Sequence, residues 1–205
     1  MNKTSYEVAI HKDIPVLRFP GQAHFEAWLE THAENPQAVW LQFAKKASPH
    51  TTITYIEARD TALCYGWIDS VINAYDTDFY LTKFTQRRKK SIWSEVNVGV
   101  IERLTAEGRM KPRGLQEVEA AKADGRWERA YAPQSSATIP EDLQQAIDAS
   151  PKARATFEKL TSASRYALFF RSTHVTDPAK RSKKIGELVE MLERGEAPHL
   201  IPPKK

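Results

Sequence analysis

The sequence has few of the features that mark disulfide-bonded, membrane-spanning or exported proteins. Its 205 residues include one cysteine, Cys64, so no disulfide can form within the chain. No apolar run approaches the ~20 residues that a membrane-spanning helix needs. The first residues, MNKTSYEVAIHKDIPVLRF, contain no continuous apolar segment of signal-peptide type. Together these absences predict a cytoplasmic protein with no membrane span.

Motifs for metals and for common cofactors are also missing. The sequence contains no HExxH, CxxC, GxGxxG, GxxxxGK[ST] or GxSxG pattern. His24 and His32 lie eight positions apart, and neither has a histidine or cysteine three or four residues away. We therefore expect no cofactor and no dedicated metal site.

Charge of one sign is not in large excess. Lys and Arg number 30 against 26 Asp and Glu, which leaves a formal net charge of +4. Hydrophobic residues make up 41% of the chain and charged residues 27%, as in ordinary globular proteins. The net charge alone does not favour a nucleic-acid-binding protein, so that function would need a local cluster of cations.

The first part of the chain predicts a small α+β unit. Residues 14–20 read as an extended lead-in, and apolar residues at helical spacing follow from Phe25 to His32. Residues 38–46 alternate as a strand does, with Val39, Leu41 and Phe43 on one face. Thr54 and Glu57 have the spacing of a capping box that opens a helix ending near Gly66. Residues 69–84 read as a hairpin with its turn at 76–78.

The rest of the chain predicts helices. Ser94 and Pro112 each suit a helix start, and the residues expected to face inward from these two helices are Val96, Val100, Ile101, Leu104, Leu115 and Val118. The pairs Ser150-Pro151 and Asp177-Pro178 each read as an N-cap followed by proline. Residues 131–140 have the composition of a connector. We expect an α+β domain with trailing helices over 1–133 and a helical domain over 134–205.

Several stretches resemble one family, the bacteriocin-protection, YdeI or OmpD-associated proteins. In the C-terminal part the stretches are IPEDLQQAI (139–147), PKARATFEKL (151–160), SRYALFF (164–170) and KRSKKIGELVEMLERGE (180–196). Upstream they are WLQFAKK, YIEARDTALCYGWIDS, YLTKFTQRRKKSIWSEVN and LTAEGRMKPRGL, so the resemblance runs from about Val39 to Pro198. It implies a role in resistance to bacteriocins or antimicrobial peptides. It implies no settled reaction and supplies no catalytic residues.

The stretch FTQRRKKSIWSEVN (84–97) is the first candidate for a binding site. A helix beginning near Ser94 would present unpaired backbone N–H groups and the positive end of its dipole to an anion. Arg87 and Arg88 could add charged donors, with Ser91 and Asn97 close in sequence. The ring of Trp93 could stack on a ligand, although anchoring the helix to the core fits it better. Lys89 and Lys90 fit a solvated turn.

The stretch CYGWID (64–69) is the second candidate. Cys64 falls in the last turn of a predicted helix, where the dipole raises its pKa, so a structural role is favoured. Asp69 follows Trp67 at a helix-to-strand junction and could meet Arg87 or Arg88. Such a pair could be structural or could belong to a site.

The third candidate is the basic face of the final helix. Lys180, Lys183 and Lys184 fall on one side of it, opposite the apolar residues, as in an ordinary amphipathic surface helix. Lysine lacks the planar fork of arginine, which weakens the case for a specific anion site there.

These observations favour a noncatalytic binding and stress-protection protein that holds a small anionic ligand at a cation-rich helix N-terminus. The expected ligand-binding residues are Trp67, Asp69, Arg87, Arg88, Ser91, Trp93, Ser94 and Asn97. Two alternatives stay open. One is an enzyme with Asp69 as acid or base and Arg87 or Arg88 as an anion clamp. The other is a nucleic-acid-binding protein.

Overall fold

The computed structural model describes residues 6–35 and 37–198. Contacts divide the chain into two compact units. The first extends to Trp93 and resumes from Asn97 to Arg129, and the second holds Ser94–Val96 and the chain from Ala130 onward. One unit carries a five-stranded sheet with helices and the other is helical, so the predicted α+β class is confirmed. Among the described residues, no helix combines the length and hydropathy that crossing a membrane requires.

The sheet of the first unit has the strand order β1-β2-β3-β5-β4. Its strands are β1 (Glu7–His11), β2 (Ile14–Leu17), β3 (Val39–Ala44), β4 (Trp67–Ala74) and β5 (Phe79–Gln86). β2 and β3 run parallel, and the other neighbours are antiparallel. The predicted hairpin is confirmed as β4 and β5, whose turn is held by Asp76 Oδ1 accepting from the Asp78 and Phe79 amides.

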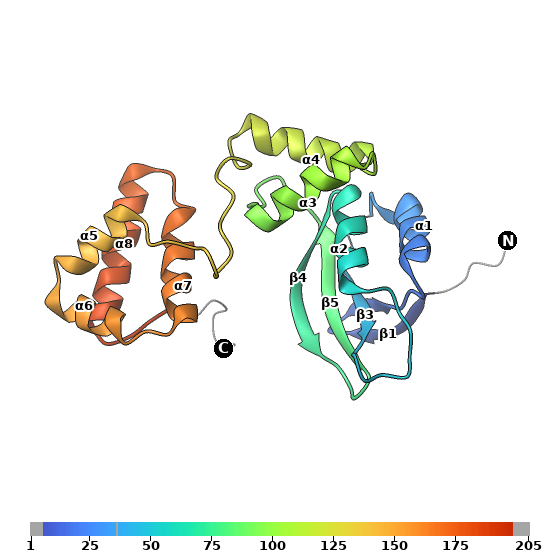
Figure 1. The fold of residues 1–205 in the computed structure, drawn as a ribbon, viewed down its shortest axis with the longest axis horizontal. Coiled ribbons are helices and arrows are strands. Elements are labelled where there is room, and N and C mark those ends of the chain that lie inside the picture. The colour runs from blue at the N-terminus through green and yellow to red at the C-terminus, as the bar shows by residue number, and fades with distance from the viewer. Residues whose placement is uncertain (1–5, 36, 199–205) are drawn as a thin grey trace. The chain divides into compact units, whose positions relative to one another are not determined.

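Two helices cover one face of this sheet: α1 (Gln22–His32) and α2 (Tyr55–Cys64) (Figure 1). The rings of Phe25 on α1 and Phe84 on β5 lie 6.1 Å apart, so aromatic contacts join the layers. α2 begins with the predicted capping box, because the Thr54 hydroxyl accepts from the Glu57 amide while the Glu57 carboxylate accepts from Thr54. Gly66 follows α2 with a positive φ of 73°, which the predicted helix end requires.

The opposite face of the sheet is also buried, toward the edge that β1 and β2 form. Val16, Trp40 and Leu81 form a buried cluster there, and Trp40 Nε1 donates to the His11 carbonyl at 3.1 Å. Trp40 and Gln42 are therefore buried as fully as the three β3 residues expected to face inward. Alternation predicted one buried face for β3, and its central position gives it two.

Two further helices, α3 (Glu95–Ala106) and α4 (Pro112–Ala123), follow the sheet. α4 approaches α2 through Gly114, where an added Cβ would lie 2.2 Å from the Cys64 carbonyl oxygen. The contact surface of α4 therefore contains Gly114, Val118 and Ala121, and Leu115 is turned away and 41% exposed. Val96 lies in the first turn of α3, ahead of the buried Ile101 and Leu104, and is 47% exposed. The inward positions predicted for Leu115 and Val96 were wrong.

The second unit consists of helices around their own core. They are α5 (Glu141–Asp148), α6 (Pro151–Glu158), α7 (Ser162–Thr173) and α8 (Pro178–Glu193). The core contains Leu143, Ile147, Ala153, Leu168, Ile185, Leu188 and Leu192. Ser150 and Asp177 cap α6 and α8 as predicted, each accepting from the amide three residues on. The sequence did not predict β1, α5 or α7 as elements.

We predict that Gly114→Ala destabilises the protein by about 2 kcal/mol, because α2 and α4 must separate to admit the methyl group. Equilibrium urea unfolding measures this. Gly99→Ala in α3 is the matched control, since nothing lies within 4 Å of its added Cβ. That control should be neutral or stabilising by up to ~1 kcal/mol, because alanine is the better helix former. Equal stability of the two variants would contradict a close contact at Gly114.

Candidate functional site

Arg87, the central cation of the predicted site, follows β5 and is buried. It is 3% exposed, and its guanidinium carbon lies 3.5 Å from the centre of the Trp93 ring. Its Nη1 donates to the Ile92 carbonyl at 3.1 Å, and its backbone N–H donates to Gly66 at 2.9 Å. These contacts tie the end of the sheet to the chain that leads to α3.

The two tryptophans of the predicted site are core residues. Trp93 is 1% exposed and its ring centre lies 4.9 Å from that of Trp127. Trp67 is fully buried, donates from Nε1 to the Ala33 carbonyl at 2.9 Å, and packs edge-on against Trp28. Their burial gives both rings a structural role.

The remaining residues of the predicted site do not lie together in one place. Arg88 and Ser91 form a turn, in which the Arg88 amide donates to Ser91 Oγ at 3.0 Å and the Ser91 amide donates back to the Arg88 carbonyl. Arg88 is exposed, as are Lys89 and Lys90. Ser94 pairs with Tyr131 in the second unit, whereas Asn97 belongs to the first. The predicted residue set thus divides between the two units, and its ligand-binding role stays a prediction.

Asp69 is engaged with Tyr55. The Tyr55 hydroxyl donates to Asp69 Oδ2 at 3.0 Å, across from α2 to β4. Burial, followed by the charge of Asp69, raises the pKa of Tyr55, so the phenol stays protonated at neutral pH. This hydrogen bond fastens the start of α2 to the sheet.

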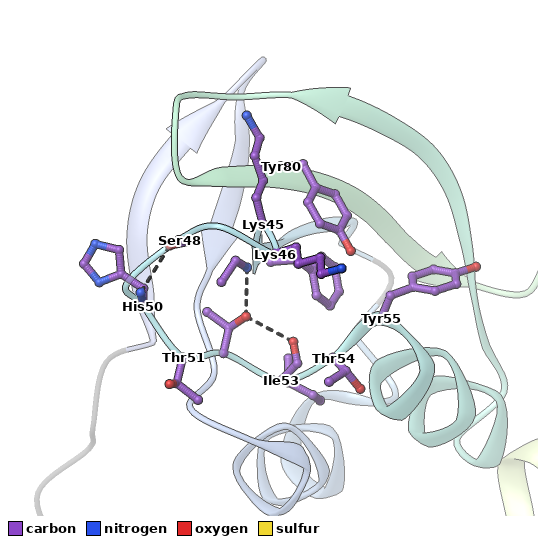
Figure 2. A pocket seen from close by; sticks show the side chains of 12 residues that line it. Lys45, Lys46, Ser48, His50, Thr51, Ile53, Thr54, Tyr55 and Tyr80 are labelled. Atoms are coloured by element: carbon purple, nitrogen blue, oxygen red, sulfur yellow. Dashed lines mark hydrogen bonds between the residues drawn. The ribbon is translucent and has the colours of Figure 1, made fainter.

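The first unit contains a pocket that was not predicted from the sequence, and both lysines and hydroxyl-bearing side chains line it (Figure 2). Its volume is about 310 Å³. The loop between β3 and α2 forms most of it, and Phe43 and Tyr80 add walls from the sheet. Its polar lining consists of Lys45, Lys46, Ser48, His50, Thr51, Thr52, Thr54, Tyr55 and Tyr80, with no carboxylate among the lining residues. The segment KKASPHTT ahead of a capping box was the available signal.

Hydrogen bonds fix the loop that forms the pocket. Thr52 Oγ1 accepts from the Ala44 amide at 2.9 Å and donates to the Ile53 carbonyl at 3.1 Å. Lys45 Nζ donates to the Asp76 carbonyl at 2.5 Å, which ties the loop to the β4–β5 turn. These bonds hold the pocket shape without using the Lys46 ammonium group.

The side chains of the pocket differ in how they face it. In Figure 2 the Lys45 side chain extends toward the β4–β5 turn, and that of Lys46 extends the other way, toward Tyr80 and Tyr55. The His50 ring stacks on Phe79 with centres 5.0 Å apart and is drawn pointing away from the pocket. Burial raises the pKa of Tyr80, so its hydroxyl remains a neutral donor. The hydroxyls of Thr52, Thr54 and Tyr55 already donate within the fold. The lining donors that remain are the Lys46 ammonium and the hydroxyls of Ser48, Thr51 and Tyr80, a set that suits a small anion.

Two other candidate groups, Cys64 and the cations of α8, make contacts that stabilise the fold. Cys64 is buried, and burial raises the pKa of its thiol to about 11, so little nucleophilic thiolate forms at neutral pH. On α8, Arg181 Nε and Nη2 donate to the two Asp142 oxygens at 2.5 and 2.8 Å, which joins α8 to α5. Across residues 6–35 and 37–198, no three His, Cys, Asp or Glu side chains are arranged to hold a metal ion.

Comparisons with known proteins match two separate segments. Residues 136–195 match the family described as "Bacteriocin-protection, YdeI or OmpD-Associated", which confirms the resemblance for the helices of the second unit. Residues 17–117 match a different family, a domain of unknown function (DUF8412). The segment that carries the pocket thus lies in the domain of unknown function. No curated protein and no solved structure matches the chain.

We predict that Arg87→Ala lowers the free energy of unfolding by about 2–4 kcal/mol, because it leaves a cavity over Trp93. Arg88→Ala, at the exposed neighbour, should change stability by no more than about 0.5 kcal/mol. Urea unfolding followed by tryptophan fluorescence compares the two. A stable Arg87→Ala protein would contradict the structural role of this arginine.

Cys64 should resist a thiol reagent in the folded protein at pH 8 and react rapidly once the chain is unfolded in guanidinium chloride. A thiol pKa raised from 9.0 to about 11 also lowers stability as pH rises through this interval, since the unfolded chain loses its proton first. The Cys64→Ser variant should therefore show a shallower loss of stability between these pH values. Rapid labelling of the folded protein at pH 8 would refute a buried thiol.

Proposed function

We propose that the protein is a noncatalytic binding protein, and that its first unit holds a small anionic ligand in the pocket of Figure 2. The observation that carries the proposal is the pocket lining, which combines lysine and hydroxyl donors and includes no carboxylate. A cation and hydroxyl donors, with no carboxylate among the lining residues, favour phosphate or carboxylate groups.

The pocket also lies at a helix N-terminus. This helix is α2, whereas the sequence predicted a site at the N-terminus of α3. The positive end of the α2 dipole adds to the field at Thr54 and Tyr55. The Glu57 carboxylate already accepts hydrogen bonds from the Thr54 amide and hydroxyl, at 2.9 and 2.8 Å. The anion therefore belongs on the Lys46 side of the pocket, away from Glu57.

The match of residues 136–195 relates this proposal to protection against bacteriocins. Binding of an anionic ligand by one unit would accompany a protective role of the other. The proposal places the protein in the cytoplasm, since a single buried cysteine suits a reducing compartment.

The test is calorimetric titration of the full chain with inorganic phosphate, pyrophosphate and a single-stranded oligonucleotide. Lys46→Gln should weaken the binding of the small anions about tenfold, because one charge-assisted hydrogen bond contributes about 1.5–3 kcal/mol. Lys46 is suited to this test because its side chain is exposed, so its loss should leave the fold intact. Lys89→Gln, at another exposed lysine of the same unit, is the matched control and should bind normally.

Three outcomes would count against the proposal. Absence of phosphate and pyrophosphate binding would refute it outright. Loss of binding in Arg88→Gln, with Lys46→Gln unaffected, would place the site at the 87–91 turn predicted from the sequence. Tighter binding of the oligonucleotide, with steep salt dependence, would favour a nucleic-acid-binding protein.

A further inference from the structure

One face of α7, in the second unit, borders two adjoining pockets. The residues of α7 that line them follow helical spacing: Ser162, Arg165, Tyr166, Phe169, Phe170 and Thr173. The connector at residues 130–140 forms the opposite wall of both pockets, and Ala137 and Thr138 are common to the two. A groove therefore follows α7 along the connector.

Two hydrogen bonds hold the connector against α7. Tyr166 donates from its hydroxyl to the Ala132 carbonyl at 3.0 Å, and Gln134 Nε2 donates to Ser162 Oγ at 3.2 Å. The larger pocket, which has a volume of about 610 Å³, lies beside them and extends to α6. Its volume is within the roughly 300–1,000 Å³ typical of small-molecule sites.

The floor of this larger pocket is apolar. Ile139, Phe157, Leu160 and Phe169 line it and pack against the core of the second unit. The Phe157 and Phe169 ring centres are 6.5 Å apart. Such a floor suits a hydrophobic or aromatic body and would not bind a compact hydrophilic ion such as phosphate.

Arg165 gives the pocket its one charged side chain. Its guanidinium carbon lies 4.9 Å from the Phe157 ring centre, and Nη2 donates to the Glu158 carbonyl at 2.9 Å. Its Nε is buried and has no hydrogen-bond partner among the described residues. Nη1 forms no hydrogen bond with any described residue, so it is the donor of this guanidinium that a ligand can use.

We propose that this pocket binds a small amphipathic anion, an aromatic carboxylate, with its ring on Phe157 and Phe169 and its carboxylate on Arg165. Aromatic rings stack on such a floor, and a carboxylate accepts a charge-assisted hydrogen bond from the guanidinium. The site is independent of the proposed function of the first unit, because it lies in the second unit and shares no residue with the pocket of Figure 2.

Titration of the full chain with 2-naphthoate and with its neutral analogue 2-naphthamide tests the proposal, since the pair differs chiefly in charge. Naphthoate should bind at least about tenfold more tightly than the amide. Arg165→Gln should weaken naphthoate about tenfold and bring the two ligands to similar affinity. Arg154→Gln, at the exposed arginine of α6, is the matched control and should preserve the difference.

Two more variants test whether naphthoate binds in this pocket and whether this site is separate from that of the first unit. Ala137→Trp places a large ring in the pocket from the connector, without altering Arg165, and should abolish binding of both ligands. Lys46→Gln should weaken phosphate without affecting naphthoate, which separates this site from that of the first unit. Equal affinity for naphthoate and naphthamide, absence of naphthoate binding, or its loss in Arg154→Gln with Arg165→Gln unaffected would each overturn the proposal. Circular dichroism spectra confirm that each variant is folded.

Discussion

The arrangement of the first unit depends on burying β3 on both faces. An internal strand with Leu41 and Phe43 on one side and Trp40 on the other must be covered twice. α1 and α2 lie on the first side, and on the second side Trp40 packs with Val16 and Leu81 and donates a hydrogen bond to the His11 carbonyl. This double cover fixes the chain before and after β3. The loop that leaves β3 must return to α2, and in doing so it forms the candidate anion pocket.

Cations have three different roles in this protein. Arg87 and Arg181 are held by contacts within the fold, on the Trp93 ring and on the Asp142 carboxylate. Arg88, Lys89 and Lys90 extend into solvent. Lys46 and Arg165 each line a pocket, and they are the cations on which the two proposed sites depend. Charge density along the sequence does not separate these roles, because burial and the nearest acceptor decide them.

Helix ends were the part of the fold most open to prediction. The capping box at Thr54 and Glu57, the proline-containing starts at Ser150 and Asp177, and the end of α2 at Gly66 depend on groups only a few residues apart. The side of a helix that faces the core was harder to predict. Leu115 was expected inward from spacing, but the close approach at Gly114 turns the helix so that Val118 and Ala121 make the contact. The candidate pocket was missed because Lys46 and Tyr80 are 34 positions apart in the sequence (80 − 46) and meet only when β3 and β5 pair.

The sequence by itself determined the α+β class, the starts of α2, α4, α6 and α8, the β4–β5 hairpin and the resemblance of the C-terminal segment to the bacteriocin-protection family. Each of these depends on interactions between near neighbours in the chain or on a contiguous match. Only the tertiary structure decided that Arg87 is buried on Trp93, that Asp69 bonds to Tyr55, and that Lys46 and Arg165 line pockets. The physical reason is that burial and hydrogen-bond partners are set by strand pairing and helix packing between distant segments, and these give the same residue type opposite roles.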